Sequence, residues 1–130
     1  MTDVVVAVPK AKWEAWIAEG DLPGQPWSGL YSVFTVGTRR PSICSGERVY
    51  VVAHGRLRGY APLFELRYDR REVSAGDHRS AYRTMVLWSL VRRGDPVAVT
   101  IPGQIRGFQG WRYRWWDREA EVPFQDWRIP

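Results

Sequence analysis

The chain has 130 residues, the size of one domain, and its 45% hydrophobic and 25% charged residues are typical of a globular protein and not of a disordered one. Its apolar runs are shorter than the roughly 18–20 residues of a membrane span, and the apolar residues 4–8 follow no basic leader. A single cysteine, Cys44, excludes an internal disulfide and cannot hold a metal alone. We expect one cytoplasmic domain over residues 1–130, with no metal, no cofactor and no membrane partner.

The net charge of +5 and the eight tryptophans are unusual for a chain of this size. A basic surface attracts phosphate polyanions, and arginine together with aromatic side chains is what unpaired bases stack on. Tryptophan also fills cores and anchors protein interfaces. A core this small does not hold eight indoles with every N–H group paired. The composition therefore favours nucleic acid, either RNA or DNA, as a partner.

The first third of the chain predicts two strands around one helix. Residues 4–8 form a β-branched apolar run, which indicates a buried strand. A proline precedes residues 10–19, for which we expect a helix that ends at a glycine. Proline and glycine mark residues 21–29 as a loop, and residues 30–36 predict a second strand.

The middle of the chain gives the clearest β signal. After a loop over residues 37–46, residues 47–54 are rich in valine and tyrosine, and a His-Gly turn leads into residues 56–68. This pattern predicts a central hairpin. Pro62 predicts a break, a bulge or an edge position in its second strand.

The last part of the chain predicts a second helix and two further strands. Residues 78–93 follow helix-capping residues and carry a broad apolar set, so we expect a mostly buried helix of about 16 residues there. Residues 97–101 predict a strand, residues 102–110 a glycine-rich loop, and residues 111–118 the final strand. The element order predicts an α+β domain, a small curved mixed β-sheet with two flanking helices.

The final strand is the strongest candidate for a binding surface. Side chains alternate across a strand, so neighbours on one face lie roughly 6.5–7 Å apart. One face would carry Trp111, Tyr113 and Trp115. The opposite face would carry Arg112, Arg114, Trp116 and Arg118, and Arg106 in the glycine-rich loop would extend it. This second face predicts a stacking surface that follows a phosphate backbone; the alternative is a solvated face above an aromatic core.

A second basic cluster lies on the central hairpin and in the loop before it. It consists of Arg56, Arg58 and Arg67, with Arg39 and Arg40 in the preceding loop. Arg56, Arg58 and Tyr60 alternate along one strand and are expected to share a face. We predict that Tyr60 and the arginines 39, 40, 56 and 58 also contact nucleic acid.

Candidate catalytic residues are few. His54 and His78 lack the spacing of a zinc site, and the acidic residues form no paired-ligand pattern. His54 in its turn is a candidate general base, with a structural role as the alternative. Cys44 has arginine neighbours but no histidine or asparagine motif around it. The glycine-rich loop has neither Walker nor dinucleotide-binding spacing. The residues thus favour binding over catalysis.

The segment SGERVYVVAHGRLRGYA, residues 45–61, is similar to the central hairpin of PUA-like domains, especially the ASCH and EVE groups. A Gly-acidic-Arg-Val turn enters a strand, and a short loop leads to a Gly-aromatic strand. The predicted elements before and after it extend the resemblance over most of the chain. It implies a pseudo-barrel with flanking helices and a cleft that accepts RNA or a flipped, often modified, base.

Some ASCH members are hydrolases that act on modified cytidine with a Lys-Thr-Glu set. The matching segment here, residues 19–24, reads EGDLPG and has no lysine or threonine. The Gly-x-Lys-x-x-Glu-x-Arg pattern of ASCH domains is also missing. The resemblance therefore carries over no catalytic residue.

Three hypotheses follow for the function. The first is a nucleic-acid-binding PUA-like module that recognises RNA or a flipped or modified base. The second is a metal-independent ASCH-type hydrolase that acts on a modified nucleoside or on RNA. The third is a protein-interaction module anchored by exposed indoles of Trp27, Trp116 and Trp127.

We expect a base-sized pocket between the first helix and the central hairpin. Trp27 lies in a segment too polar and rich in turns to be core. A flipped base would stack on its indole and hydrogen-bond by its edge to Ser28 or Gln25. The alternative is that Trp27 covers the end of the sheet as an apolar lid.

Overall fold

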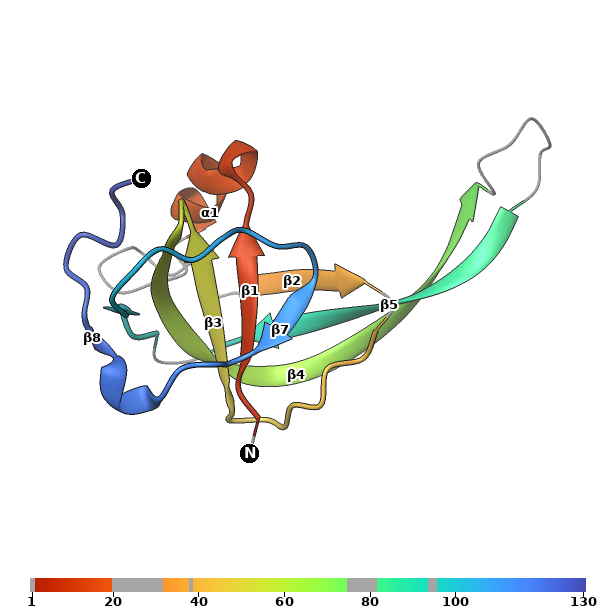
Figure 1. The fold of residues 1–130 in the computed structure, drawn as a ribbon. Coiled ribbons are helices and arrows are strands. Elements are labelled where there is room, and N and C mark those ends of the chain that lie inside the picture. The colour runs from red at the N-terminus through yellow and green to blue at the C-terminus, as the bar shows by residue number, and fades with distance from the viewer. Residues whose placement is uncertain (1, 20–31, 38, 75–81, 94–95) are drawn as a thin grey trace.

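The computed structural model describes residues 2–19, 32–37, 39–74, 82–93 and 96–130. This part of the chain is mostly β-structure (Figure 1). Its elements are β1 (Val4–Val8), the 3-10 helix η1 (Lys10–Lys12), α1 (Trp13–Glu19), β2 (Ser32–Gly37), β3 (Arg48–Ala53), β4 (Arg56–Ser74), β5 (Tyr82–Arg92), β6 (Val99–Thr100), β7 (Trp111–Tyr113), the 3-10 helix η2 (Arg118–Ala120) and β8 (Val122–Pro123). None of the helices in these ranges has the length and apolar character needed to cross a membrane.

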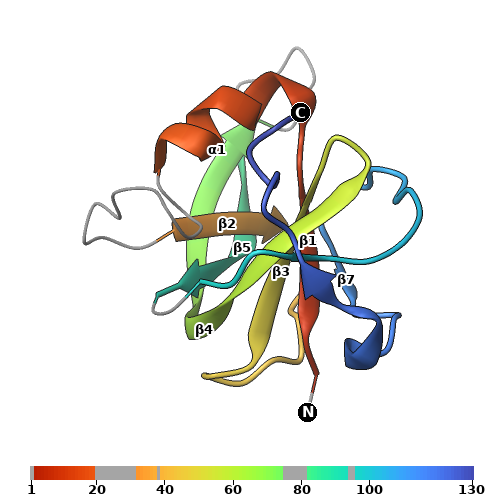
Figure 2. The same ribbon diagram turned by 90° about the vertical axis from the view of Figure 1, so that its left-hand side faces the viewer.

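Six strands form one curled sheet in the order β2-β5-β4-β3-β1-β7, and β6 pairs with β8 in a separate ribbon. β1 runs parallel to β3, whereas the other neighbours in the large sheet are antiparallel. Figure 2 looks into the curl and shows α1 above one end of it. The predicted small, curved, mixed sheet is confirmed.

The predicted helix over residues 78–93 is wrong, because residues 82–92 form β5. Residues 85–91 form a nearly continuous apolar run, and periodicity alone does not distinguish a buried helix from a strand with apolar side chains on both faces. β5 lies between β4 and β2, and these neighbours supply its main-chain hydrogen bonds. The structure therefore has one α-helix in its described residues, the seven-residue α1, and not the two that were predicted.

β4 is long enough to pair with two strands in turn. Residues 56–62 pair with β3, and residues 63–74 pair with β5. Pro62 lies at the change of partner, and the register shifts between Leu63 and Glu65, so the irregularity expected near this proline is confirmed. Beyond the pair Gly37–Trp88, where β2 ends, β4 and β5 continue alone away from the rest of the sheet (Figure 1). We call this ribbon, residues 68–74 with residues 82–88, the arm.

β1 is buried on both faces of the sheet, which explains its continuous apolar sequence VVVAV. Val4, Val6 and Val8 belong to the larger core cluster, together with the tryptophans of α1. Val5 points the other way, into a second cluster with Tyr50 and Trp116. The α1 helix therefore covers one face of the sheet, and the segments before and after β7 cover the other.

Candidate functional site

The two edges of the curled sheet meet along a seam between β2 and the segment that leads into β7. An Arg39 NH2 group donates to the carbonyl oxygen of Trp111 at 3.1 Å, and the Trp111 indole donates back to the carbonyl oxygen of Arg39 at 3.0 Å. The Arg39 guanidinium also lies 3.8 Å from the centroid of the Trp111 ring. Gly110 lies so near β2 that a Cβ atom on it would sit 3.5 Å from the carbonyl oxygen of Val36. These contacts join the two sheet edges along part of the seam.

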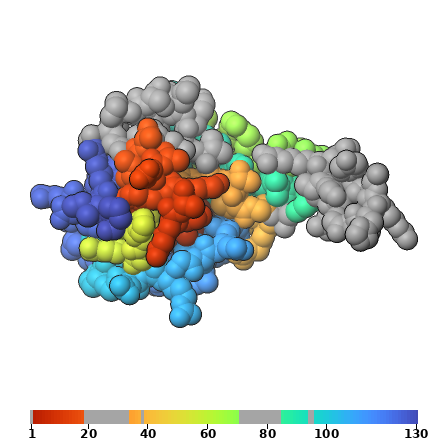
Figure 3. All heavy atoms as spheres, turned by 90° about the horizontal axis from the view of Figure 1, so that it is seen from above, coloured from red at the N-terminus to blue at the C-terminus, as the bar shows by residue number. Residues whose placement is uncertain are grey.

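A cavity of about 440 Å³ opens along the same seam, and we call it the seam cavity. This volume is within the range of small-molecule sites. Viewed from above in Figure 3, the first helix (red), the β2 region (orange) and the segment around residue 110 (blue) lie next to one another. The cavity is lined by residues 6–9 at the end of β1, by Lys12, Ala15 and Trp16, by residues 34–36 of β2, and by residues 108–110.

The difference in length between β1 and β7 exposes strand edges to the cavity. The β1–β7 ladder ends at the pair Val6–Trp111, while β1 continues to Val8. Within the described residues, no strand pairs with Ala7 or Val8 on that side. Unpaired main-chain groups at a strand edge can hydrogen-bond to a ligand as they would to another strand.

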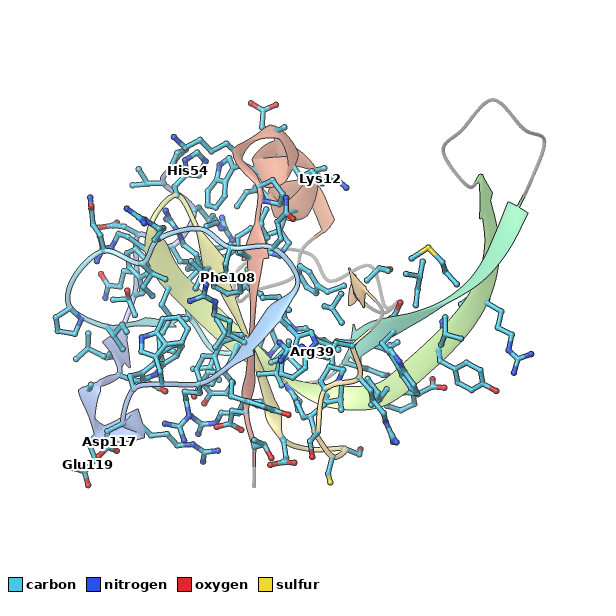
Figure 4. All side chains as sticks on the ribbon, turned by 45° about the vertical axis from the view of Figure 1, so that its right-hand side comes forward. Lys12, Arg39, His54, Phe108, Asp117 and Glu119 are labelled. Atoms are coloured by element: carbon cyan, nitrogen blue, oxygen red, sulfur yellow. The ribbon has the colours of Figure 1, made fainter. Side chains whose placement is uncertain are left out.

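The side chains around the cavity are aromatic, with a few polar groups. Trp16 is only 3% exposed and is supported by Trp13 and Trp127, whose ring centroids lie 5.4 and 5.8 Å away. Phe108 is half-buried, and the Arg112 guanidinium lies 4.8 Å from its ring centroid. Figure 4 shows Lys12 on the helical turn at the top, with Phe108 below it. The cavity thus combines rings, cations and free strand edges, which suit a planar, partly polar ligand that carries a negative charge.

The predicted basic row on the last strand does not form, because β7 ends at Tyr113 and the alternation of side chains ends with it. Arg114 and Arg118 instead bind the carboxylate of Asp3, with nitrogen–oxygen distances of 3.0 and 2.8 Å. Burial of this carboxylate raises the Asp3 pKa. Hydrogen bonds from the Arg48 amide and from the two arginine side chains outweigh burial, so the pKa lies below its usual value. These two arginines therefore form ion pairs that hold the N-terminal segment against the segment that follows β7.

Trp116 is buried, contrary to the exposed position predicted for it. Its indole donates to Glu121 Oε2 at 2.9 Å, and the Tyr50 hydroxyl donates to the same oxygen at 2.6 Å. Arg48 completes the cluster by pairing with Glu121 at 3.2 Å. Burial raises the pKa of Tyr50, and the Glu121 carboxylate raises it further. Trp127 is also buried, so two of the three predicted interface anchors belong to the core.

Arg56 and Arg58 share a face of β4, but Tyr60 does not join them. Both guanidinium groups lie over the ring of Phe124. The β3–β4 register shifts between Val51 and Val52, and this bulge leaves Arg58 as the extra residue of β4. Tyr60 consequently packs in the second core cluster. The predicted shared face is right for the two arginines and wrong for the tyrosine.

Arg58 is a buried cation whose hydrogen bonds go to main-chain carbonyl groups. It donates to Ala53 at 2.9 Å, to Trp127 at 3.1 Å and to Ile129 at 2.6 Å. Burial lowers its pKa to about 10, and the charge of Arg56 contributes to the shift. With 1% of its surface exposed, Arg58 does not reach a nucleic acid in this conformation.

The remaining predicted residues fall into two groups. Arg39, Arg40, Arg56, Arg106 and Arg112 are exposed, and of these Arg39 and Arg112 lie at the seam. Gln25, Trp27 and Ser28 lie outside the described residues. The predicted pocket between the first helix and the central hairpin depends on these three residues, so it also lies outside the described part of the chain. The seam cavity is a different one, bounded by the first helix, β2 and residues 108–110.

Lys12, Phe34, Phe108 and Gln109 line the cavity and were not predicted. Only Phe108 carried a signal in the sequence. It is an aromatic residue within a glycine-rich loop, the same feature that drew attention to Trp27. The position of Lys12 depends on a 3-10 turn before α1, which the sequence pattern did not distinguish from a longer helix.

The candidate catalytic residues have structural contacts. His54 has a φ of 47° in its turn, and its ring lies edge-on to Trp13 with 4.9 Å between centroids. Cys44 is exposed, and its main-chain N–H donates to the Glu47 carboxylate at 2.8 Å. The described residues contain no cluster of three side chains that could hold a metal ion.

Comparison of the chain with protein-family models, with curated proteins and with solved structures finds no match.

Proposed function

We propose that this chain is a nucleic-acid-binding module of the PUA-like type that holds one base of a strand in the seam cavity. The observation that carries the proposal is the cavity beside α1, walled by Trp16, Phe34 and Phe108, with Lys12 at the helical turn. Stacking on an aromatic side chain contributes about 1–3 kcal/mol per base and tolerates any sequence, because every base has a flat face.

The cavity is surrounded by three kinds of group that bind a nucleotide: aromatic rings, hydrogen-bonding groups and cations. The half-buried rings of Phe34 and Phe108 offer faces for stacking. The edge of Ala7 and Val8, which no described strand covers on the β7 side, offers donors and acceptors for the edge of a base together with the Gln109 amide. Lys12 and Arg112 supply positive charge for the phosphates.

The PUA-like part of the proposal is supported by the architecture. A mixed sheet curls into a half-barrel, its first strand is followed by a helix, and the cavity opens beside that helix. Among the described residues, the polar side chains at the cavity are Lys12, Thr35 and Gln109. A lysine and a threonine are also members of the Lys-Thr-Glu set, but this described lining has no carboxylate to complete it, which supports binding over the ASCH-type hydrolysis considered above. The interaction-module hypothesis loses support because Trp116 and Trp127 are buried.

Binding of fluorescent single-stranded RNA and DNA, followed by anisotropy at several salt concentrations, tests the proposal. Lys12→Gln should reduce the slope of log affinity against log salt by about 0.7, the value for one phosphate contact on a single strand. Lys10→Gln is the matched control, because Lys10 is an exposed lysine of the same η1 turn that does not line the cavity. Equal effects of the two substitutions would contradict the assignment of Lys12.

The stacking wall is tested in the same assay. Phe108→Ala should weaken binding about 5- to 150-fold, the equivalent of one lost base stack. Phe64→Ala removes an exposed ring from β4, away from the cavity lining, and should leave binding unchanged. If the wild-type protein binds neither RNA nor DNA, the proposed function is wrong.

A further inference from the structure

The ladder of the arm places its side chains on two faces. In its ladder Tyr68 pairs with Trp88 and Arg70 pairs with Val86, so these four side chains share one face. Asp69 is the next residue along β4 and belongs to the other face. A ribbon of two strands has no sheet beyond it to bury either face, and such ribbons are only marginally stable in water.

The face of Tyr68 is a continuation of the core face of the sheet. Leu66 and Leu90 form the preceding pair on the same face, and both leucines pack in the larger core cluster. Trp88 still packs against this cluster, whereas Tyr68 is 58% exposed. The apolar face that is buried inside the half-barrel thus continues along the arm, where Tyr68 is exposed to solvent.

Two adjacent aromatic rings lie between two guanidinium groups on this face. The rings of Tyr68 and Trp88 lie 5.5 Å apart between centroids, and the Arg40 guanidinium lies 5.1 Å from the centroid of the Trp88 ring. Arg70 is exposed and follows Tyr68 on the same face. We call Arg40, Trp88, Tyr68 and Arg70 the arm track.

The arm track begins next to the seam cavity. Trp88 pairs with Gly37 of β2, and the preceding residue, Val36, lines the cavity. When one base of a nucleic-acid strand lies in the cavity, the neighbouring nucleotides of that strand would therefore contact the start of the arm. Single strands bind to surfaces that combine aromatic rings, on which bases stack, with cations that contact the phosphates.

From these contacts we infer that the arm track is a second binding surface for the single nucleic-acid strand whose base occupies the seam cavity. The inference rests on the proposed function and extends it from one nucleotide to several. Bases stack on Tyr68, and Arg70 pairs with a phosphate. Arg40 keeps the Trp88 ring in position at the start of the track.

Binding of oligonucleotides of two lengths distinguishes the contribution of the arm track from that of the seam cavity. We would measure the affinity of the wild-type protein for single strands of about four and about twelve nucleotides, in RNA and DNA form, because only the longer strand spans both surfaces. Tyr68→Ala should weaken binding of the long strand at least about 5-fold, and Arg70→Gln should lower its salt slope by about 0.7. Neither substitution should change the affinity for the short strand.

Arg67→Gln is the control for Arg70→Gln. Arg67 is also an exposed arginine of β4, but it pairs with Ser89 on the opposite face and is bound to Glu65 at 3.2 Å. It should leave the affinity for both strands unchanged. If Tyr68→Ala disturbs folding, as judged by its thermal midpoint, the Arg70→Gln and Arg67→Gln pair decides the question alone.

The outcomes are distinct for the two proposals. A loss confined to the long strand supports the arm track. Equal affinities of wild type and arm variants for the long strand, with the short strand still bound through Lys12 and Phe108, overturn the arm track alone and mean that the Tyr68–Trp88 pair only stabilises the ribbon. Failure of the wild-type protein to bind either length overturns both proposals.

Discussion

The guanidinium group of Arg58 lies 4.8 Å from the centroid of the Trp13 ring, so a buried cation of the central hairpin packs directly on α1. The same side chain holds the carbonyl groups of Trp127 and Ile129 near the C-terminus. Trp127 in turn packs on Trp16, which lines the seam cavity. Arg58 thereby connects the hairpin, the helix and the C-terminal segment behind one wall of the cavity.

We expect Arg58→Met to destabilise the protein by about 3 kcal/mol, because it leaves buried carbonyl groups without donors. Arg56→Met removes an exposed arginine two residues away and should change the free energy of unfolding by less than about 0.5 kcal/mol. Urea unfolding of both variants measures the difference. Similar values for the two would mean that the three carbonyl contacts of Arg58 contribute little.

Asp3→Asn tests the ion pairs that fasten the N-terminus. Two of the partners, Arg114 and Arg118, are partly exposed, so we expect a loss of about 2 kcal/mol at neutral pH, below the cost of breaking a fully buried pair. The folded-state pKa of Asp3 is lowered, so its contribution is present above the unfolded-state pKa of about 3.9 and is lost as pH falls through the folded-state value.

The stability difference between wild type and Asp3→Asn should therefore be constant from pH 7 to about pH 5 and shrink below about pH 4. Urea midpoints measured across this range show the effect. A difference that grows on acidification would contradict the sign of the pKa shift at Asp3.

Tyr50→Phe removes one of the three hydrogen bonds that Glu121 accepts from side chains and should cost about 1–2 kcal/mol. The raised pKa of Tyr50 predicts that this phenol stays protonated while the protein is folded. Ultraviolet difference titration of the native variant should therefore match that of the wild type. A smaller tyrosinate signal from the variant would show that Tyr50 ionises in the folded protein.

Gly110→Ala tests the backbone conformation at the point where the two sheet edges approach each other. Gly110 has a φ of 74°, which side chains rarely adopt, whereas its Cβ would lie at an ordinary contact distance of 3.5 Å from the Val36 carbonyl oxygen. We expect a cost of about 1 kcal/mol together with weaker oligonucleotide binding. Gly107→Ala, in the same loop with open space around it, is the control and should change neither property.

The parts of the fold that were predicted correctly are those in which local pattern and pairing agree. The valine run of β1 is buried on both faces, and the central hairpin turns at His54 and Gly55 as its sequence indicates. β5 was mistaken for a helix because Met85 and Trp88 also have helical spacing. Residues 82–92 form a strand because β4 is long enough to pair with them along their whole length.

The site was harder to predict because it depends on contacts between distant residues. The sequence alone identifies no acidic partner that would keep Arg114 and Arg118 from binding a phosphate. Only the fold brings Asp3 close enough to pair with them. A bulge in β4 separates Tyr60 from Arg58 although their spacing suggests a shared face. The seam cavity exists because the sheet curls until β2 approaches β7, and no local pattern encodes that distance.

Backbone amide chemical shifts, followed during titration with a short single strand, show whether a base lies in the seam cavity. We expect saturable shifts for the amides of Ala7, Val36 and Gly110, which surround the cavity, and for the indole N–H of Trp16. Phe108→Ala should weaken the affinity obtained from these shifts. Shifts confined to exposed arginines elsewhere, with the cavity resonances unchanged, would contradict the account.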